Sequence, residues 1–200
     1  MKLIKMEISD YLDTLASASP APGGGSASAL TGAQGIALAI MVCNLTIGKE
    51  KYKEYEQDCK TTAKELSKLF DAMCAAVDND TDAYSEVSAA YKISKDDPKR
   101  GKAIKAAMLL ATKVPFKTME IAIQAMRLVS QLFGKTNTNA VSDLEVAILS
   151  LQVALKGAWL NVKINLSGLD DEEVKARFVE NGKNMLKEAE KIKSQIDLEI

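Results

Sequence analysis

The chain has 200 residues, 47% of them hydrophobic, and its net charge of −1 comes from 26 basic and 27 acidic side chains. These values predict one soluble globular domain with its own core, and the charge balance and the 5% aromatic content argue against a nucleic-acid or membrane surface. Histidine is absent, which excludes Ser-His-Asp and Cys-His catalysis and histidine zinc sites. Any general acid or base must therefore be Asp, Glu, Lys, Tyr, Cys or a water that they hold.

The first expected helix is short, with Ser9 as its N-cap. A loop containing two prolines and three glycines, residues 20–25, then leads into the most apolar segment of the chain, residues 27–47. Ser26 is the expected N-cap of this second helix. The segment is apolar on every side and rich in small residues, which is typical of a helix packed closely in the middle of a bundle.

Helical periodicity continues after this segment. It predicts an amphipathic helix over about 55–78, a cap or bend at the polar run 78–82, and more helix to about residue 92. Asp97 followed by a proline predicts a new helix start, and Pro115 is expected to kink or break that helix.

Gly134 is the expected end of that region, and Ser142 is expected to open a long helix that runs to about Leu166. Asp170 is the expected cap of a final helix. The pattern as a whole predicts an all-α bundle of six to eight helices that forms a single domain over residues 1–200.

The three cysteines lie 15 or more residues apart and form no CxxC motif, which is typical of a reduced cytoplasmic protein. The segment Met1–Lys5 is too short for a signal peptide. Residues 27–47 are a poor membrane span because they contain Gln34, Asn44 and many alanines and glycines. A cytoplasmic location is expected.

Several polar residues stand in apolar surroundings. Asn161 and Asn165 lie four apart and so project from one helical face, and Asn44 lies near the end of the most apolar segment. Each is either a structural cross-link or a ligand contact. Asp82 and Asp143 lie near expected helix starts, where a carboxylate either caps the helix or serves a site.

Distance restricts how these residues can cooperate. Asp143 and Asn161 are separated by roughly 27 Å, and Ser26 and Lys49 by roughly 35 Å, if each helix is continuous. Three alternatives follow: the ligand is long, two subunits contribute opposite helix ends to one site, or some of the residues are structural.

Six stretches together carry a family resemblance that spans nearly the whole chain: PGGGSASAL (22–30), MVCNLTIGK (41–49), DAY (82–84), ATKVP (111–115), NTNAVSD (137–143) and NVKINL (161–166). They resemble the cyclodeaminase/cyclohydrolase family of folate enzymes. That family includes formimidoyltetrahydrofolate cyclodeaminase, the C-terminal half of formiminotransferase-cyclodeaminase, and stand-alone methenyltetrahydrofolate cyclohydrolases. The resemblance implies an all-helical homodimer that binds tetrahydrofolate derivatives, polyglutamylated ones included, with no cofactor other than this substrate and no metal.

The implied activity is hydrolysis of 5,10-methenyltetrahydrofolate to 10-formyltetrahydrofolate, which a stand-alone chain favours. The alternative is cyclodeamination of 5-formimidoyltetrahydrofolate with release of ammonia. Both reactions need one group that takes a proton and one that gives it. A non-catalytic folate-binding dimer of the same fold is the alternative from a different class.

With histidine absent, Asp82 and Asp143 are the predicted acid/base residues. The other predicted site residues would receive ligand oxygens on backbone N–H groups, orient water or the pterin ring, or bind the glutamate tail. They are Gly23, Gly24, Gly25, Ser26, Asn44, Lys49, Lys51, Asn139, Ser142, Asn161 and Asn165.

Overall fold

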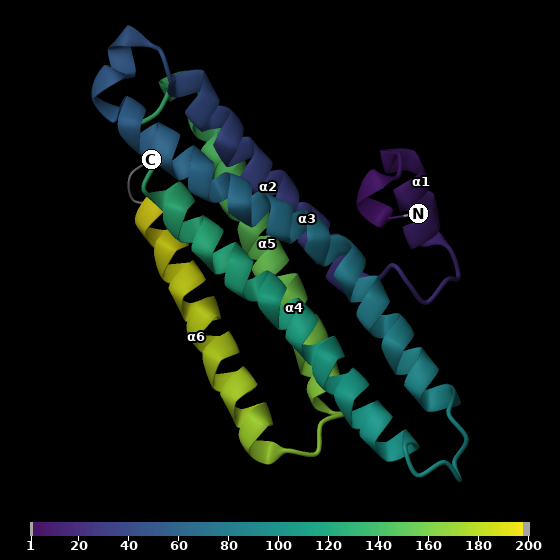
Figure 1. Cartoon of the computed structure of the whole chain (residues 1–200). Coiled ribbons are helices and arrows are strands. Elements are labelled where there is room, and N and C mark those ends of the chain that lie inside the picture. Colours follow the sequence, from purple (N-terminus) through teal and green to yellow (C-terminus); the bar gives the residue numbers. More distant parts are fainter. Residues whose placement is uncertain (1, 198–200) are drawn as a thin grey trace.

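The computed structural model describes residues 2–197, and over this range the chain forms six α-helices, three short 3-10 helices and no strand (Figure 1). The all-α fold predicted from the sequence is confirmed. The α-helices are α1 (Ile8–Ala16), α2 (Gly24–Thr46), α3 (Glu56–Lys92), α4 (Arg100–Ser130), α5 (Val141–Leu166) and α6 (Glu172–Asp197). The 3-10 helices are η1 (Leu3–Lys5), η2 (Glu50–Tyr55) and η3 (Thr138–Ala140).

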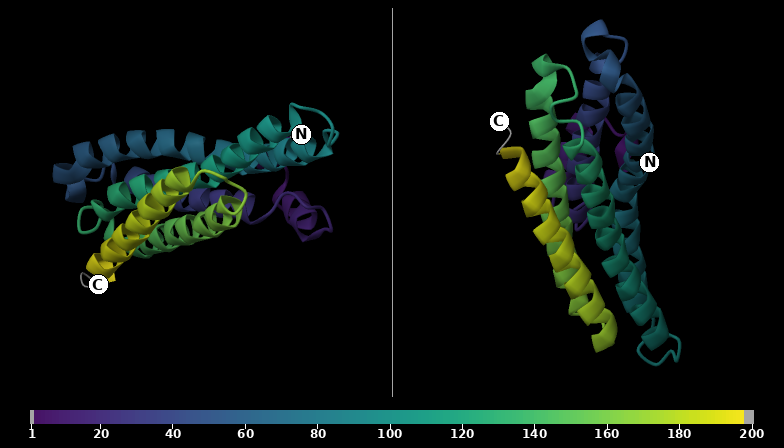
Figure 2. Two further views of the ribbon diagram at one scale, coloured as in Figure 1. Left: turned by 90° about the horizontal axis from the view of Figure 1, so that it is seen from below. Right: turned by 90° about the vertical axis from the view of Figure 1, so that its left-hand side faces the viewer.

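Four long helices close into a ring around one apolar core. α2 packs against α3 and α5, and α4 packs against the same two helices from the other side. α6 lies outside this ring along α4 and α5 (Figure 2). The α3–α4 hairpin extends beyond the N-terminal end of α2, and α1 lies to the side of the bundle (Figure 1).

Small residues let α2 pack closely, as predicted. A Cβ added at Gly32 would lie 2.8 Å from the Met73 Cε on α3, and one added at Gly35 would lie 2.8 Å from the Ala147 carbonyl oxygen on α5. Among the described residues, α2 is the one helix long and apolar enough to span a membrane. Its packing between α3 and α5 accounts for the same composition, because the core helix of a water-soluble bundle is equally apolar.

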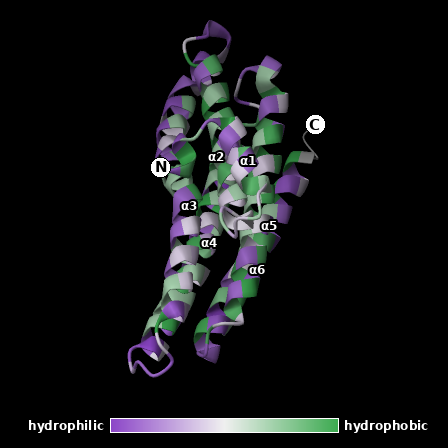
Figure 3. Ribbon diagram, turned by 90° about the vertical axis from the view of Figure 1, so that its right-hand side faces the viewer, coloured by the Kyte–Doolittle hydropathy of each residue, from purple (hydrophilic) through white to green (hydrophobic). Residues whose placement is uncertain are grey.

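One side of α2 is nevertheless uncovered, which differs from the expectation of a fully enclosed helix. Figure 3 views the molecule from the side on which α1 lies, and hydrophobic stretches are visible there along α2 and α5. We call this surface the α2–α5 face. It comprises large apolar side chains that are between 38% and 71% exposed: Met41, Leu45, Val146, Leu149, Val153, Leu160 and Ile164.

Two expected helix breaks are absent. α3 runs without interruption through the polar run 78–82, so the predicted cap or bend there is wrong. α4 likewise continues through Pro115 as one helix. Both helices are held along their lengths by tertiary packing, which outweighs the local preferences of these residues.

Three caps also differ from the sequence predictions. α1 begins at Ile8 and not after Ser9. α2 begins at Gly24, which places Ser26 in its first turn and not at the cap. At the start of α6 the capping residue is Asp171 and not Asp170. Asp171 Oδ1 accepts hydrogen bonds from the backbone N–H groups of Glu173 and Val174.

Candidate functional site

A pocket of about 350 Å³ lies at the N-terminal end of α2. The glycine loop, α3, α4 and α5 each contribute to its wall. Its lining residues are Pro20, Ala21, Gly23, Gly24, Asp80, Ala83, Tyr84, Val87, Met108, Ala111, Asn161 and Asn165. This volume is at the lower end of the range for small-molecule sites, enough for a fused ring system but not for a long ligand.

Asp80, the one carboxylate among the lining residues, holds the start of α2 from the neighbouring helix. The Ser26 N–H donates to Asp80 Oδ2 at 3.0 Å, and the Ser26 hydroxyl donates to the Val77 carbonyl. A Cβ on Gly25 would lie 1.9 Å from Asp80 Oδ1. Glycine is therefore required at position 25 so that the carboxylate of α3 can reach the first turn of α2.

Burial raises the pKa of the Asp80 carboxyl above its ordinary value, and the hydrogen bond from the Ser26 N–H offsets part of that rise. Asp80 thus binds its proton at a higher pH than an exposed aspartate does. A carboxyl with a raised pKa at a pocket wall is a candidate general acid/base.

Asn161 lines the pocket next to the glycine loop. Its Nδ2 donates to the Gly157 carbonyl one turn earlier on α5, at 2.9 Å. The same amide lies against Gly24, where an added Cβ would be 3.4 Å from the Asn161 Nδ2. The amide oxygen and the first N–H groups of α2 therefore form a polar rim on one side of the pocket.

Asn165 supplies the hydrogen-bond donor that Pro115 removes from α4. Proline has no N–H, so the Ala111 carbonyl four residues earlier on α4 lacks its usual helical donor. The Asn165 Nδ2 donates to that carbonyl oxygen at 2.7 Å. Two of the stretches that carry the family resemblance thus meet in one hydrogen bond, and the structural role suggested for Asn165 is present.

We predict that Asn165→Ala lowers the free energy of unfolding by about 1–3 kcal/mol, because the carbonyl of the buried Ala111 loses its donor at the pocket wall. In a Pro115→Ala background the helix supplies the missing N–H, so the same substitution should cost much less. Equilibrium urea unfolding of the four proteins measures the difference. Asn161→Ala is the matched control and should cost the same in both backgrounds, since it donates within α5. Equal costs of Asn165→Ala with and without the proline would refute this account.

The remaining predicted residues lie at the other end of the bundle, where α2 ends and α5 begins. These residues are Asn44, Lys49, Lys51, Asn139, Ser142 and Asp143. All are exposed except Asp143, which is half-buried. Asp143 lies in the first turn of α5, near a helix start as predicted.

Hydrogen bonds hold the connections at this end together. The Asn137 N–H donates to Thr46 Oγ1 at 3.0 Å, and the Thr138 N–H donates to Tyr52 Oη at 3.0 Å. The side-chain and backbone hydrogen bonds with Thr138, together with the nearby Lys51, lower the pKa of Tyr52 to about 8. Lys51 lies over the Tyr52 ring, with its Nζ 5.1 Å from the ring centroid.

The structure therefore brings the glycine-loop residues together with Asn161 and Asn165, but not with the second cluster. α5 is one unbroken helix, so the roughly 27 Å between Asp143 and Asn161 stands within one chain. Asp82 is exposed on α3 and is not among the residues that line the pocket.

Asp80 is the functional candidate that the sequence interpretation missed. The apolar stripe of α3 includes Met73 and Val77, and one further step of three residues reaches Asp80. Continuing the helix through the polar run would have placed this carboxyl on the inner face. The expected bend at 78–82 hid that signal.

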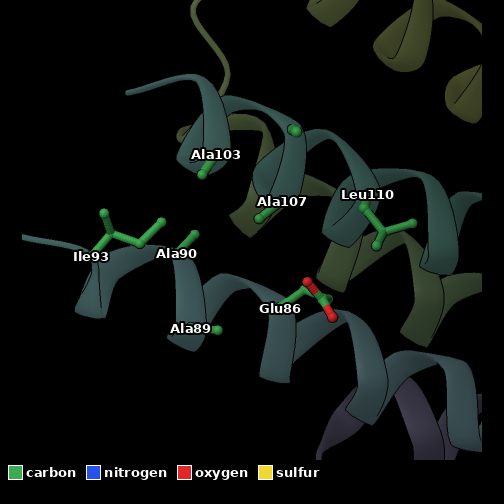
Figure 4. A pocket seen from close by; sticks show the side chains of 8 residues that line it. Glu86, Ala89, Ala90, Ile93, Ala103, Ala107 and Leu110 are labelled. Atoms are coloured by element: carbon green, nitrogen blue, oxygen red, sulfur yellow. The ribbon is translucent and has the colours of Figure 1, made fainter. Parts of the chain in front are cut away.

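A larger hollow of about 460 Å³ lies between the far ends of α3 and α4 (Figure 4). Figure 4 shows Ala90, Ala103 and Ala107 on its flanks and Glu86 as the charged side chain beside it. Alanine ridges of two packed helices account for such a hollow, and apart from Glu86 its lining side chains are apolar. The smaller pocket at Asp80 is therefore the better candidate site.

Comparison with solved structures places the fold. A formiminotetrahydrofolate cyclodeaminase from Thermotoga maritima superimposes with a TM-score of 0.91 over 99% of this chain and 97% of that one, at 23% identity. The bundle thus has the cyclodeaminase fold.

Sequence comparisons place the family. A family model described as formiminotransferase-cyclodeaminase matches residues 7–184. A methenyltetrahydrofolate cyclohydrolase from Methylorubrum extorquens is 38% identical over 193 residues, which cover 94% of this chain and 93% of that protein. The mouse formimidoyltransferase-cyclodeaminase is 28% identical over 94% of this chain but only 35% of its own length. The chain belongs to the formiminotransferase-cyclodeaminase family.

Proposed function

We propose that this protein is a methenyltetrahydrofolate cyclohydrolase, which hydrolyses 5,10-methenyltetrahydrofolate to 10-formyltetrahydrofolate. The observation that carries the chemistry is the buried Asp80 carboxyl at a pocket wall, whose pKa is raised by burial. The choice between the two family reactions is supported by the cyclohydrolase from Methylorubrum extorquens, which this chain matches over nearly the full length of both proteins.

In the proposed mechanism the ionised Asp80 takes a proton from a water molecule as the water oxygen attacks the electrophilic methenyl carbon. A neutral tetrahedral adduct forms. The bond from this carbon to N5 then breaks while Asp80 returns its proton to N5. The second proton of the original water leaves to solvent as the formyl C=O forms on N10. We assign binding of the pterin ring and its oxygens to Asn161 and the N–H groups of the glycine loop, because these groups line the same pocket as Asp80.

The test is a spectroscopic assay of the purified full chain. Loss of the methenyltetrahydrofolate absorbance, at a rate well above the uncatalysed hydrolysis, is the expected result. A second reaction starts from 5-formimidoyltetrahydrofolate. Appearance of the methenyl signal with ammonia, and no hydrolysis in the first assay, would reassign the protein as a cyclodeaminase. Stoichiometric folate binding with no turnover in either assay would reassign it as a binding protein.

We further propose that the protein works as a homodimer joined through the α2–α5 face. Large exposed apolar patches on monomers mark interaction surfaces, and this one follows α5 for most of its length and continues onto the C-terminal part of α2. α1 lies on the same side of the molecule (Figure 3), and its Ile8 and Leu12 are exposed. A second copy of the chain offers an equally apolar and equally long surface, as a self-complementary two-fold interface requires.

Such a dimer brings the two separated groups of predicted site residues together if the paired helices run antiparallel. A two-fold axis across the middle of α5 then places the Asp143 end of one copy beside the Asn161 end of the other. The pocket of about 350 Å³ would hold the pterin head, and the rest of a folate would extend toward the second subunit. In this arrangement Lys49 and Lys51 are placed to bind glutamate carboxylates of the tail, including those of polyglutamylated folates.

A further inference from the structure

Two buried side-chain oxygens in the described part of the chain have no hydrogen-bond partner: Tyr11 Oη and Asp78 Oδ2. Both belong to the region where the N-terminal segment, residues 3–16, meets the stretch of α3 that carries Asp80. The Leu3 N–H donates to the other oxygen of Asp78 at 2.6 Å, which fixes this segment to α3. The unpaired polar atoms therefore gather beside the candidate site and not at random in the core.

Tyr11 is the one buried residue of α1, with 5% of its surface exposed, whereas Ile8 on the same helix is 79% exposed. Packing alone does not require its hydroxyl, because phenylalanine would fill the same space without an unpaired polar atom in the core. Burial raises the pKa of the Tyr11 phenol, and the negative charge of Asp80 raises it further. The hydroxyl thus keeps its proton and lies within the electrostatic reach of the carboxyl.

Few other groups near Asp80 can exchange a proton with it. On its own helix these are Asp78 and Tyr84, and α2 contributes only the uncharged N–H of Ser26. The lining residues from α4 and α5 carry no ionisable group. The Tyr11 phenol on α1 is a further neutral donor near Asp80, and unlike the Ser26 N–H it has no hydrogen-bond partner among the described residues.

We propose that Tyr11 is a positioning residue for Asp80: the Tyr11 hydroxyl donates to the ionised carboxylate through one water and so controls when Asp80 can act as a base. The N-terminal segment is then a part of the active site and not only a cover of the bundle. This inference rests on the proposed function for its effect on turnover. Its effect on Asp80 itself can be measured without any turnover.

The test is the Tyr11→Phe variant of the full chain. An NMR titration of protein labelled with ¹³C at the aspartate carboxyl carbons measures the pKa of Asp80. The Asp80→Asn variant assigns the Asp80 signal. Removing a donor to the ionised form should raise the pKa of Asp80, by about one unit for a hydrogen bond to a charged group. The acidic limb of the pH profile of kcat/KM should move to higher pH by the same amount, so that kcat/KM on that limb falls about tenfold. KM should be nearly unchanged, and the rate at high pH should equal that of the unmodified protein. Tyr91→Phe, which removes an exposed hydroxyl away from the pocket, should move neither.

Tyr11→Phe should keep the melting temperature or raise it, because an unpaired buried hydroxyl is lost. If that variant fails to fold, incorporation of 3-fluorotyrosine into the unmodified sequence replaces it. The more acidic phenol is a stronger donor and should lower the pKa of Asp80. An Asp80 titration that is the same with and without the Tyr11 hydroxyl overturns the proposal. Absence of turnover in the unmodified protein would overturn the proposed function, and the titration would still decide whether Tyr11 controls Asp80.

Discussion

An Asp80→Asn variant is expected to bind methenyltetrahydrofolate but to hydrolyse it about 10²–10⁴-fold more slowly than the unmodified protein. The amide keeps the shape of the carboxyl but cannot carry the proton between water and N5. Stopped-flow absorbance at saturating substrate measures kcat, and fluorescence titration measures binding. Asp71→Asn, an exposed change on the same helix, is the neutral control.

The competing sequence prediction is tested in the same experiment. Asp82→Asn removes the exposed carboxyl two residues further along α3. If Asp82→Asn abolishes hydrolysis while Asp80→Asn retains the full rate, the assignment of the acid/base role to Asp80 is wrong and the sequence prediction stands.

Gly25→Ala should give the same loss as Asp80→Asn by displacing the carboxyl. Its Cβ would lie 1.9 Å from Asp80 Oδ1, so the hydrogen bond between the Ser26 N–H and Asp80 cannot keep its geometry. Gly101→Ala makes the same change in open space on α4 and should leave activity intact. Circular dichroism separates loss of the site from loss of the fold.

The second large effect is expected from mixing two inactive variants. In the proposed antiparallel dimer, Asp80 of one copy and Asp143 of the other serve one site, so Asp80→Asn and Asp143→Asn should each inactivate both sites of a homodimer. When the two variants are unfolded together and refolded, mixed dimers contain one site with both changes and one with neither. Activity should return to about a quarter of that of the unmodified protein.

Two outcomes would contradict the shared site. Full activity of Asp143→Asn alone would remove that residue from the site. Two inactive variants that stay inactive after mixing would place both aspartates in the site of the same copy, against the roughly 27 Å along α5. Val153→Asp, at the middle of the α2–α5 face, supplies an independent check: light scattering should show monomers, with hydrolysis lost together with the dimer.

Most of the fold could be predicted from the sequence because periodic apolar positions and flanking glycines mark the helices. The glycine loop and Asn161 lie at one pocket in the structure, near helix ends that the pattern locates. The run 78–82 was misread, since five residues that favour caps in isolation are held in α3 by contacts with α2 and α4. That error hid Asp80.

Other features had no local signal at all. The need of the Ala111 carbonyl for a donor follows from Pro115, but the partner of that carbonyl, Asn165, lies 54 residues away on another helix. The burial of Tyr11 depends on where α1 folds back onto the bundle, which its nine residues do not determine. Such contacts depend on the tertiary structure, and the periodicity of the sequence does not predict them.

The bond between Asn165 and the Ala111 carbonyl also restricts how this sequence can have changed over time. A chain with Pro115 and no amide opposite it carries an unpaired buried carbonyl, whereas a chain with the amide and no proline has merely a redundant donor. The less costly order of substitution therefore introduces the asparagine first and the proline afterwards. Once both are present, neither position is free to drift alone, so a contact that serves the packing of α4 also keeps a polar residue at the edge of the pocket.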